Sequence, residues 1–345
     1  MDRVLIPDMP SAAELMPYLR RIDAARVYVN GGPLVRELER LISERKGCYA
    51  VVVANATQGL ELALRALGLP WAMPVAVPAL TFRASGLAIQ AVGLRPVMVD
   101  CRPDTWAVDQ GSFRGVDYSV VMPVATFGRP VREWEFPTDG HVVIDAAGAL
   151  IEQEVFTDAT VVCSMHATKF WGAGEGGVVL THSSARAQDI AHMRAFGPSG
   201  TNAKMSEYHA AVALASYARL HEKMYRLTRL RVAYTHALEG LPVTIREQAD
   251  VFRSSSTLMP VLLPDGHRAE GVGDLLALAG IETRQWYRPF LSELPAFRRY
   301  HPLPVTDMLR DRLIGLPLNT CVPGGMTRDD VTRICAELGR AVSGA

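Results

Sequence analysis

The sequence has 345 residues, 49% hydrophobic and 21% charged, a balance typical of a folded globular protein of about two domains. Its 36 Lys and Arg residues equal its 36 Asp and Glu residues in number, so the composition indicates neither a nucleic-acid binder nor a basic membrane-surface protein. It has no signal-peptide core and no apolar run of about 18 residues, and its five cysteines form no C-x-x-C pair, so we expect a cytoplasmic protein without disulfides, a cysteine metal site or a membrane span.

Short apolar segments alternate with amphipathic ones through the first 200 residues. In chain order, we predict a helix over 34–45, a strand over 50–54, a helix over 60–67, a strand over 74–80, a helix over 83–92, and strands over 95–101, 118–125, 141–147, 161–165 and 177–182. This alternation predicts βαβ units and a mostly parallel sheet that helices cover on both faces.

The pattern changes after residue 201. We predict a long helix over 205–239 with one break, a strand over 257–263, an amphipathic stretch over 268–279 and a last helix after Thr327. The expected division is an N-terminal segment with a large α/β domain over 1–245 and a smaller α+β domain over 246–345.

Lysine is rare in this chain and occurs only at positions 46, 169, 204 and 223. Lys46 and Lys223 are expected on polar helix faces. Lys169 lies in a polar, glycine-rich connection between two predicted strands, where a rigid scaffold can position a catalytic side chain. A lysine there can form an imine with an aldehyde, which arginine cannot do. The G-x-G-x-x-G spacing from Gly172 to Gly177 is not a dinucleotide site, because these glycines open a strand instead of a helix.

Other polar and aromatic side chains follow predicted strands. Asp145 ends one strand, at the edge of a parallel sheet where ligands bind, although it could simply cap the next helix. Asn55 and Thr57 open a helix after another strand, which suits a phosphate or a plain N-cap. Ser164 could add a hydroxyl, and Phe82 could stack on a planar heterocycle or pack in the core.

An imine-forming lysine, an acid for a pyridinium nitrogen, a phosphate cradle and a stacking ring together match the requirements of pyridoxal 5′-phosphate (PLP). The chain resembles the DegT/DnrJ/EryC1/StrS family of PLP-dependent aminotransferases, best known as sugar aminotransferases. The resemblance runs from about residue 28 to the C-terminus in seven blocks, which are GGPLVRELERLISERKG, NATQGLELALRALGL, VPALTFRASGLAIQAVGLRPVMVDCRPDTWAVD, VVIDAAGAL, SMHATKFWGAGEGGVVLTH, GTNAKMSEYHAAVALA and GIETRQWYRPF. It implies a fold-type-I architecture, with a mostly parallel seven-stranded sheet in the large domain, a smaller C-terminal domain and a homodimer with shared active sites.

The resemblance assigns roles to individual positions. Lys169 matches the family's Schiff-base lysine, and Asp145 matches the acid that pairs with the pyridine nitrogen. Thr57, the adjoining backbone of Ala56 and Ser164 match the phosphate-binding groups.

Further matches concern the ring, the neighbouring subunit and the substrate. Phe82 matches the aromatic that stacks on the cofactor, and Asn202 matches an asparagine that reaches the phosphate from the other subunit. By family position alone, the substrate neighbours are expected to be Tyr28, Asn30 and Arg288, each of which could equally be a surface or hairpin residue.

The chain also departs from the family pattern. Gly148 stands where the family usually has Gln or His against the ring hydroxyl of the cofactor, so a side-chain hydrogen bond is missing or a water takes its place. Ala56 stands where the family often has Gly, while Asn55 stands where the family has Ser or Asn, and Lys204 replaces a family arginine. A histidine common in the family near Trp286 is absent. These departures concern the substrate more than the cofactor.

The function that the resemblance implies is transfer of an amino group from an amino acid, glutamate or glutamine, to a keto or aldehyde acceptor, with pyridoxamine 5′-phosphate as the second cofactor form. A nucleotide-linked ketosugar is the first expectation for the acceptor, in sugar, antibiotic or other secondary-metabolite biosynthesis. The alternatives are a smaller ketone, an aminocyclitol precursor or a nucleoside-type intermediate. A dehydratase of the same family would carry His in place of Lys169. A non-catalytic PLP-binding regulator would carry an added DNA-binding segment or a basic patch, and neither is visible.

Overall fold

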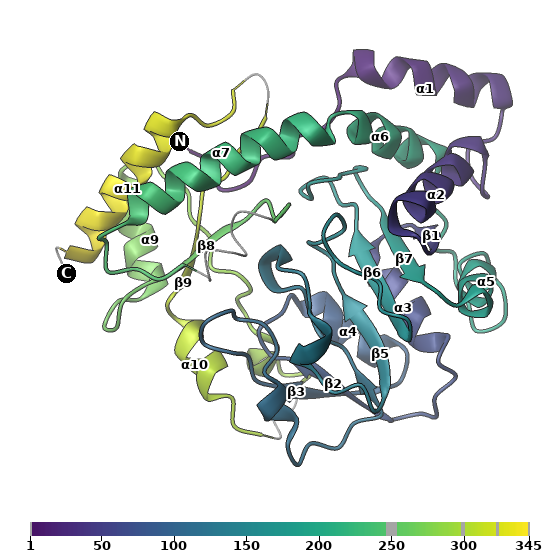
Figure 1. Cartoon of the computed structure of the whole chain (residues 1–345), viewed down its shortest axis with the longest axis horizontal. Helices are drawn as coiled ribbons and strands as arrows, with labels where there is room; N and C mark the ends of the chain where they lie inside the picture. The colour runs from purple at the N-terminus through teal and green to yellow at the C-terminus, as the bar shows by residue number, and fades with distance from the viewer. Residues whose placement is uncertain (1, 246–253, 298–300, 322–323, 344–345) are drawn as a thin grey trace.

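The computed structural model describes residues 2–245, 254–297, 301–321 and 324–343. Its centre is a seven-stranded sheet in the order β1-β7-β6-β5-β4-β2-β3 (Figure 1). The strands are β1 (Tyr49–Val53), β2 (Pro74–Pro78), β3 (Arg95–Val99), β4 (Val120–Val121), β5 (His141–Asp145), β6 (Ala159–Ser164) and β7 (Gly177–Thr181). Only β7 runs antiparallel to its neighbours, so the prediction of a mostly parallel sheet is confirmed.

Helices cover both faces of this sheet. Successive apolar residues of a strand point to opposite faces, and in β1 Val51 and Val53 pack on one helix layer while Ala50 and Val52 pack on the other. The first layer consists of α3 (Ala56–Arg65), α4 (Arg83–Ala91) and α5 (Ser184–Met193), and the second includes α2 (Pro33–Lys46) and α6 (Glu207–Ala218). The predicted α/β class follows from this double burial.

The predicted long helix has its break at Arg219, between α6 and α7 (Leu220–Leu238). Helix α1 (Ala12–Ala25), which the sequence pattern did not predict, packs on α6. Ser11 and Glu14 form a capping box at its start, with Ser11 Oγ accepting from the Glu14 N–H at 3.3 Å.

Within the described residues, the C-terminal part contains a two-stranded antiparallel sheet and three helices. They are β8 (Met259–Leu262), β9 (Leu313–Leu316), α9 (Ala269–Leu278), α10 (Pro304–Arg310) and α11 (Arg328–Ser343). The described residues also form short 3₁₀ helices over Gln110–Phe113, Thr126–Gly128, Glu133–Glu135 and Leu291–Glu293. Thr244 pairs with Leu262, so this part begins before the expected boundary at 245/246. Residues 246–253 lie outside the described residues, and the division into two domains stays a prediction.

All five cysteines are free thiols in this structure. None of the helices within the described ranges is both long and apolar enough to span a bilayer.

The prediction for Lys223 was wrong. It lies on α7 but is only 2% exposed, because Asp8 folds back over this helix and its carbonyl accepts from Lys223 Nζ at 2.9 Å. Lys46 is half-buried, and its Nζ donates to the carbonyls of Ile151 and Gln153, both at 2.9 Å. Burial lowers the pKa of Lys223 to about 8.

Because Lys223 is buried, we expect the free energy of unfolding to vary with pH in the alkaline range. Between pH 8 and 10.5 the unfolded chain holds this proton and the folded chain releases it, so the free energy of unfolding should rise with pH across this window, by about 3 kcal/mol at most. Lys223→Met removes this rise. The measurement is urea unfolding of both proteins from pH 7 to 10, and a constant difference between them at every pH would contradict the expectation.

The sheet brings the ends of distant segments to one edge. Strands β2, β5 and β6 are parallel, and β1 runs in the same direction because both β1 and β6 pair antiparallel with β7. The residues that follow these four strands therefore meet at one edge, where β7 begins at Gly177.

Candidate active site

A cavity of about 410 Å³ opens at this edge of the sheet. The predicted cofactor residues that line it are Asn55, Ala56, Thr57, Phe82, Asp145, Ser164 and Lys169, together with Gly148. The structure thus brings together segments from position 55 to position 169 at one cavity, as the parallel sheet predicted.

Lys169 lies in the loop between β6 and β7, which is held at several points. Inside the loop, the Ala173 N–H donates to the Met165 carbonyl at 2.7 Å. From α6, Ser216 Oγ donates to the Gly172 carbonyl at 2.7 Å. Thr257 Oγ1 donates to the Thr168 carbonyl, next to the lysine, at 2.8 Å. The backbone that carries Lys169 is therefore fixed by contacts from both parts of the molecule.

The electrostatic surroundings of Lys169 favour a reactive amine. Burial lowers the pKa of its ammonium group, and the negative charge of Asp145 partly opposes this shift. A lowered pKa enlarges the neutral fraction at a given pH, and only the neutral amine can attack a carbonyl carbon.

Asp145 is 5% exposed and accepts two hydrogen bonds. Ser85 Oγ, on α4, donates to its Oδ2 at 2.6 Å, and the Ala147 N–H donates to its Oδ1 at 3.1 Å. Burial raises the pKa of Asp145, while these two bonds and the charge of Lys169 oppose the rise. Ser85 is a site residue that sequence reasoning missed.

The start of α3 forms a cradle for an anion. The first N–H groups of a helix have no partner within it, and the helix dipole is positive there. Asn55 is the N-cap of α3 and accepts from the Gln58 N–H at 2.9 Å, so the capping alternative is correct. Asn55 also lines the cavity. A Cβ at Gly177 would lie 2.7 Å from the Ala56 nitrogen, so only glycine lets β7 begin this close to the cradle.

Aromatic rings form another side of the cavity. The Phe82 ring is 54% exposed, so it is not a core residue of this chain. Tyr287, which sequence reasoning did not assign, lies 6.3 Å from Phe82 between ring centroids and stacks on Phe127 at 5.0 Å with an interplanar angle of 6°. Its hydroxyl accepts from the Phe127 N–H at 3.2 Å.

Gly148 is explained by its neighbour Gly128. A Cβ at Gly148 would lie 3.0 Å from the Gly128 Cα and 3.2 Å from its nitrogen. Gly128 has a φ of +77°, a left-handed conformation that glycine adopts readily. The backbone of Gly128 thus fills the space that a side chain at position 148 would need.

Restoring the family residue at Gly148 should therefore harm this protein. We expect Gly148→Gln to lower the free energy of unfolding by about 1–3 kcal/mol through overpacking. Gly148→Ala is the matched control, because it adds the same Cβ without the amide. The measurement is urea unfolding with and without PLP, and a Gln variant as stable as the natural chain would contradict the explanation.

Four predicted residues do not line the cavity of this chain. Tyr28 and Asn202 are exposed, as is Asn30, and the Tyr28 ring stacks on Tyr208 at 6.2 Å. Arg288 pairs with Asp311 at 3.0 Å instead.

Among the residues that the structure describes, the arginine that lines the cavity is Arg284. Its guanidinium group pairs with Glu282 at 3.6 Å. Its backbone N–H donates to the Gly315 carbonyl, and the Gly315 N–H donates to the Arg284 carbonyl. The block GIETRQWYRPF contains both arginines, so its sequence alone did not distinguish Arg284 from Arg288.

The groups in the cavity fit PLP. A lysine of lowered pKa, a buried carboxylate with hydrogen bonds to both oxygens, an anion cradle and an exposed ring lie around one space large enough for a small cofactor.

Comparisons with known proteins agree with this chemistry. The DegT/DnrJ/EryC1/StrS aminotransferase family matches residues 11–339. The chain is 27% identical to dTDP-4-amino-4,6-dideoxy-D-glucose transaminase from Escherichia coli, over 91% of this chain and 92% of that protein. Its structure is similar to that of DesI, solved with its TDP-sugar product, with a TM-score of 0.90, 31% identity, and 100% and 94% of the two chains covered. A Bacillus cereus protein assigned to the PLP-dependent aminotransferases gives a TM-score of 0.88 and 28% identity over 97% and 99% of the chains. The chain is therefore a member of the DegT/DnrJ/EryC1/StrS family and a PLP-dependent aminotransferase.

Proposed function

We propose that this enzyme transfers the amino group of L-glutamate or L-glutamine to the keto carbon of a nucleotide-linked sugar. The observation that carries the proposal is the single cavity that Lys169, Asp145 and the start of α3 share. Named relatives support the sugar acceptor, since one is a transaminase of a dTDP-linked sugar and another was solved with a TDP-sugar product. A reducing cytoplasm suits the five free cysteines.

The residues of the cavity have separate roles in the reaction. Bound PLP supplies an aldehyde that bonds to amines and a pyridinium ring that withdraws electrons from the reacting carbon. Lys169 would hold the aldehyde, and its amine, in the neutral form, would take the proton from the α-carbon of the donor. Asp145, as a carboxylate, holds the proton on the pyridine nitrogen. The N–H groups of Ala56 and Thr57, with the Ser164 hydroxyl, hold the phosphate.

A second copy of the chain completes the site in this proposal. Tyr28, Asn30 and Asn202 present their side chains to solvent instead of to their own cavity. The exposed Tyr28–Tyr208 stack is the kind of aromatic surface that protein interfaces bury. We therefore place Asn202 of each subunit at the phosphate held by the other.

Absorbance of the bound cofactor tests the proposal. We expect the purified enzyme with PLP to be yellow, and L-glutamate or L-glutamine to convert the cofactor to the pyridoxamine form. This form is then offered the 4-keto-6-deoxy counterpart of the relative's dTDP-sugar, with pyruvate and a keto-cyclitol as smaller ketones. Return of the yellow band with only the smaller ketones would reject the sugar acceptor, and a band that ignores every amino donor would reject transamination.

A further inference from the structure

Residues 2–9, called here the N-terminal strap, run from the side of α11 along α7 toward α1 (Figure 1). The strap has little regular structure of its own, yet it is held at both ends. Between its two attachments, Leu5 lines the same cavity as Lys169 and Arg284.

The first attachment joins the strap to the C-terminal part. The Asp2 N–H donates to the Gly280 carbonyl at 2.8 Å, and the Leu318 N–H donates to the Val4 carbonyl at 3.3 Å. The Val4 N–H donates to Glu282 Oε2 at 3.1 Å. The other oxygen of Glu282 pairs with Arg284 at 3.6 Å, so the backbone next to Leu5 and a cavity arginine share one carboxylate.

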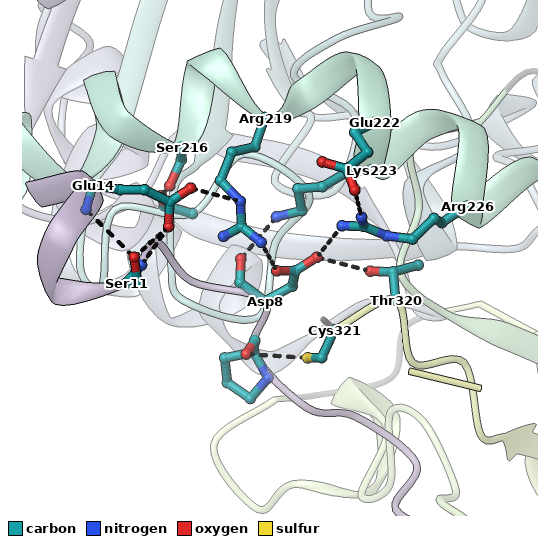
Figure 2. A network of polar contacts seen from close by, with 12 residues as sticks. Asp8, Ser11, Glu14, Ser216, Arg219, Glu222, Lys223, Arg226, Thr320 and Cys321 are labelled. Atoms are coloured by element: carbon teal, nitrogen blue, oxygen red, sulfur yellow. Dashed lines mark hydrogen bonds and ion pairs between the residues drawn. The ribbon is translucent and has the colours of Figure 1, made fainter. Parts of the chain in front are cut away.

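The second attachment is a charged cluster around Asp8, which is buried (Figure 2). Its carboxylate pairs with Arg219 at 2.8 Å and Arg226 at 3.3 Å, and accepts from Thr320 Oγ1 at 3.3 Å. The two arginines and Lys223 lie on neighbouring turns of one helical stretch, and all three face the strap. A buried carboxylate with this many partners fixes the backbone that carries it.

This cluster also contacts the loop of the imine-forming lysine. Lys223 Nζ donates to the Asp8 carbonyl at 2.9 Å and lies 5.6 Å from the centre of the Phe170 ring. Phe170 follows Lys169 and lines the cavity. The strap is therefore linked to the catalytic loop through Lys223 at one end, and it is hydrogen-bonded to the C-terminal part at the other.

We propose that the strap is a fixed wall of the active site and that Leu5 determines which acceptor fits. This inference rests on the proposed function, since it assigns a residue to the acceptor of that reaction. A donor such as glutamate, with two carboxylates and an amine, gains little from an apolar side chain. A deoxysugar carries apolar carbon that Leu5 can cover, and Leu5 is held too firmly to withdraw from a larger group.

Kinetics of each half-reaction test the role of Leu5. With the 4-keto-6-deoxy dTDP-sugar as probe, we expect Leu5→Ala to raise the KM of the acceptor about tenfold and to leave the donor half-reaction within about twofold of the natural chain. Ile6→Ala is the matched control, because Ile6 is a half-buried neighbour that does not line the cavity. Equal losses in both half-reactions, or equal effects of the two variants, would overturn the proposal.

A second variant separates this inference from the proposed function. In Leu5→Cys, alkylation of residue 5 by iodoacetamide, followed by peptide mass spectrometry, should slow about tenfold or more when the same dTDP-sugar is present at saturation. Failure of the natural enzyme to aminate this sugar rejects the proposed acceptor. Unchanged alkylation, where the natural enzyme does aminate the sugar, rejects the assignment of Leu5 alone.

Discussion

Replacing Lys169 with alanine should lower the rate of transamination by at least about a thousandfold, because one substitution removes both the covalent bond to the cofactor and the base. The geometry supports a loss without unfolding. The loop is held by backbone and side-chain contacts of Ala173, Ser216 and Thr257, and none of these uses the Lys169 amine.

Two measurements separate the roles of Lys169. After borohydride reduction, the natural chain should carry the mass of the cofactor on the peptide that contains residue 169, and Lys169→Ala should not. Lys169→Arg is the matched control, because it keeps a cation in the loop but cannot form an imine. An alanine variant with natural turnover, or a cofactor mass on the Lys46 or Lys204 peptide, would contradict the assignment.

The positions around the cavity could be predicted largely because a parallel sheet collects strand ends at one edge. Lys169 and Asp145 follow apolar runs that the pattern identified, and both line the cavity. Strand boundaries were less predictable. The apolar run 118–125 gives only the two-residue strand β4, although the Met122 N–H still donates to the Ala76 carbonyl and Val124 forms a bridge with Asp145. Pro123, between them, has no N–H with which to continue the ladder.

Partners from distant parts of the chain could not be predicted. Ser85 lies 60 positions before Asp145, and nothing in the sequence of an amphipathic helix indicates that a serine hydroxyl donates to a distant carboxylate. Lys223 was expected on a polar face because most lysines are exposed, but its partner Asp8 lies 215 positions away. Tertiary contacts of this kind decide burial, and a single sequence contains no local trace of them.

Asp145→Asn should reduce kcat/KM by about a hundredfold to ten-thousandfold while PLP remains bound through Lys169. The amide keeps the size of the side chain, but its one oxygen can accept from either Ser85 or the Ala147 N–H and not from both. The loss therefore reports the missing negative charge at the pyridine nitrogen together with one hydrogen bond. The measurement pairs steady-state kinetics with the absorbance of bound cofactor. An Asn variant with natural kcat/KM would show that the negative charge of Asp145 has no part in the reaction, since no helix that it could cap follows β5 in the described stretch before β6.

Ser85→Ala tests how that charge is maintained. The Ser85 hydroxyl lowers the pKa of Asp145 against the effect of burial, so its removal should raise this pKa. Because the reaction needs the carboxylate form, the acidic limb of the kcat/KM profile should move to higher pH, with a loss of about tenfold at the acidic side and little change at pH 8. Ser85→Thr, which keeps the hydroxyl, should restore the profile. A loss that is equal at every pH would indicate a packing defect at α4, and Ser85 would then have no part in holding the charge of Asp145.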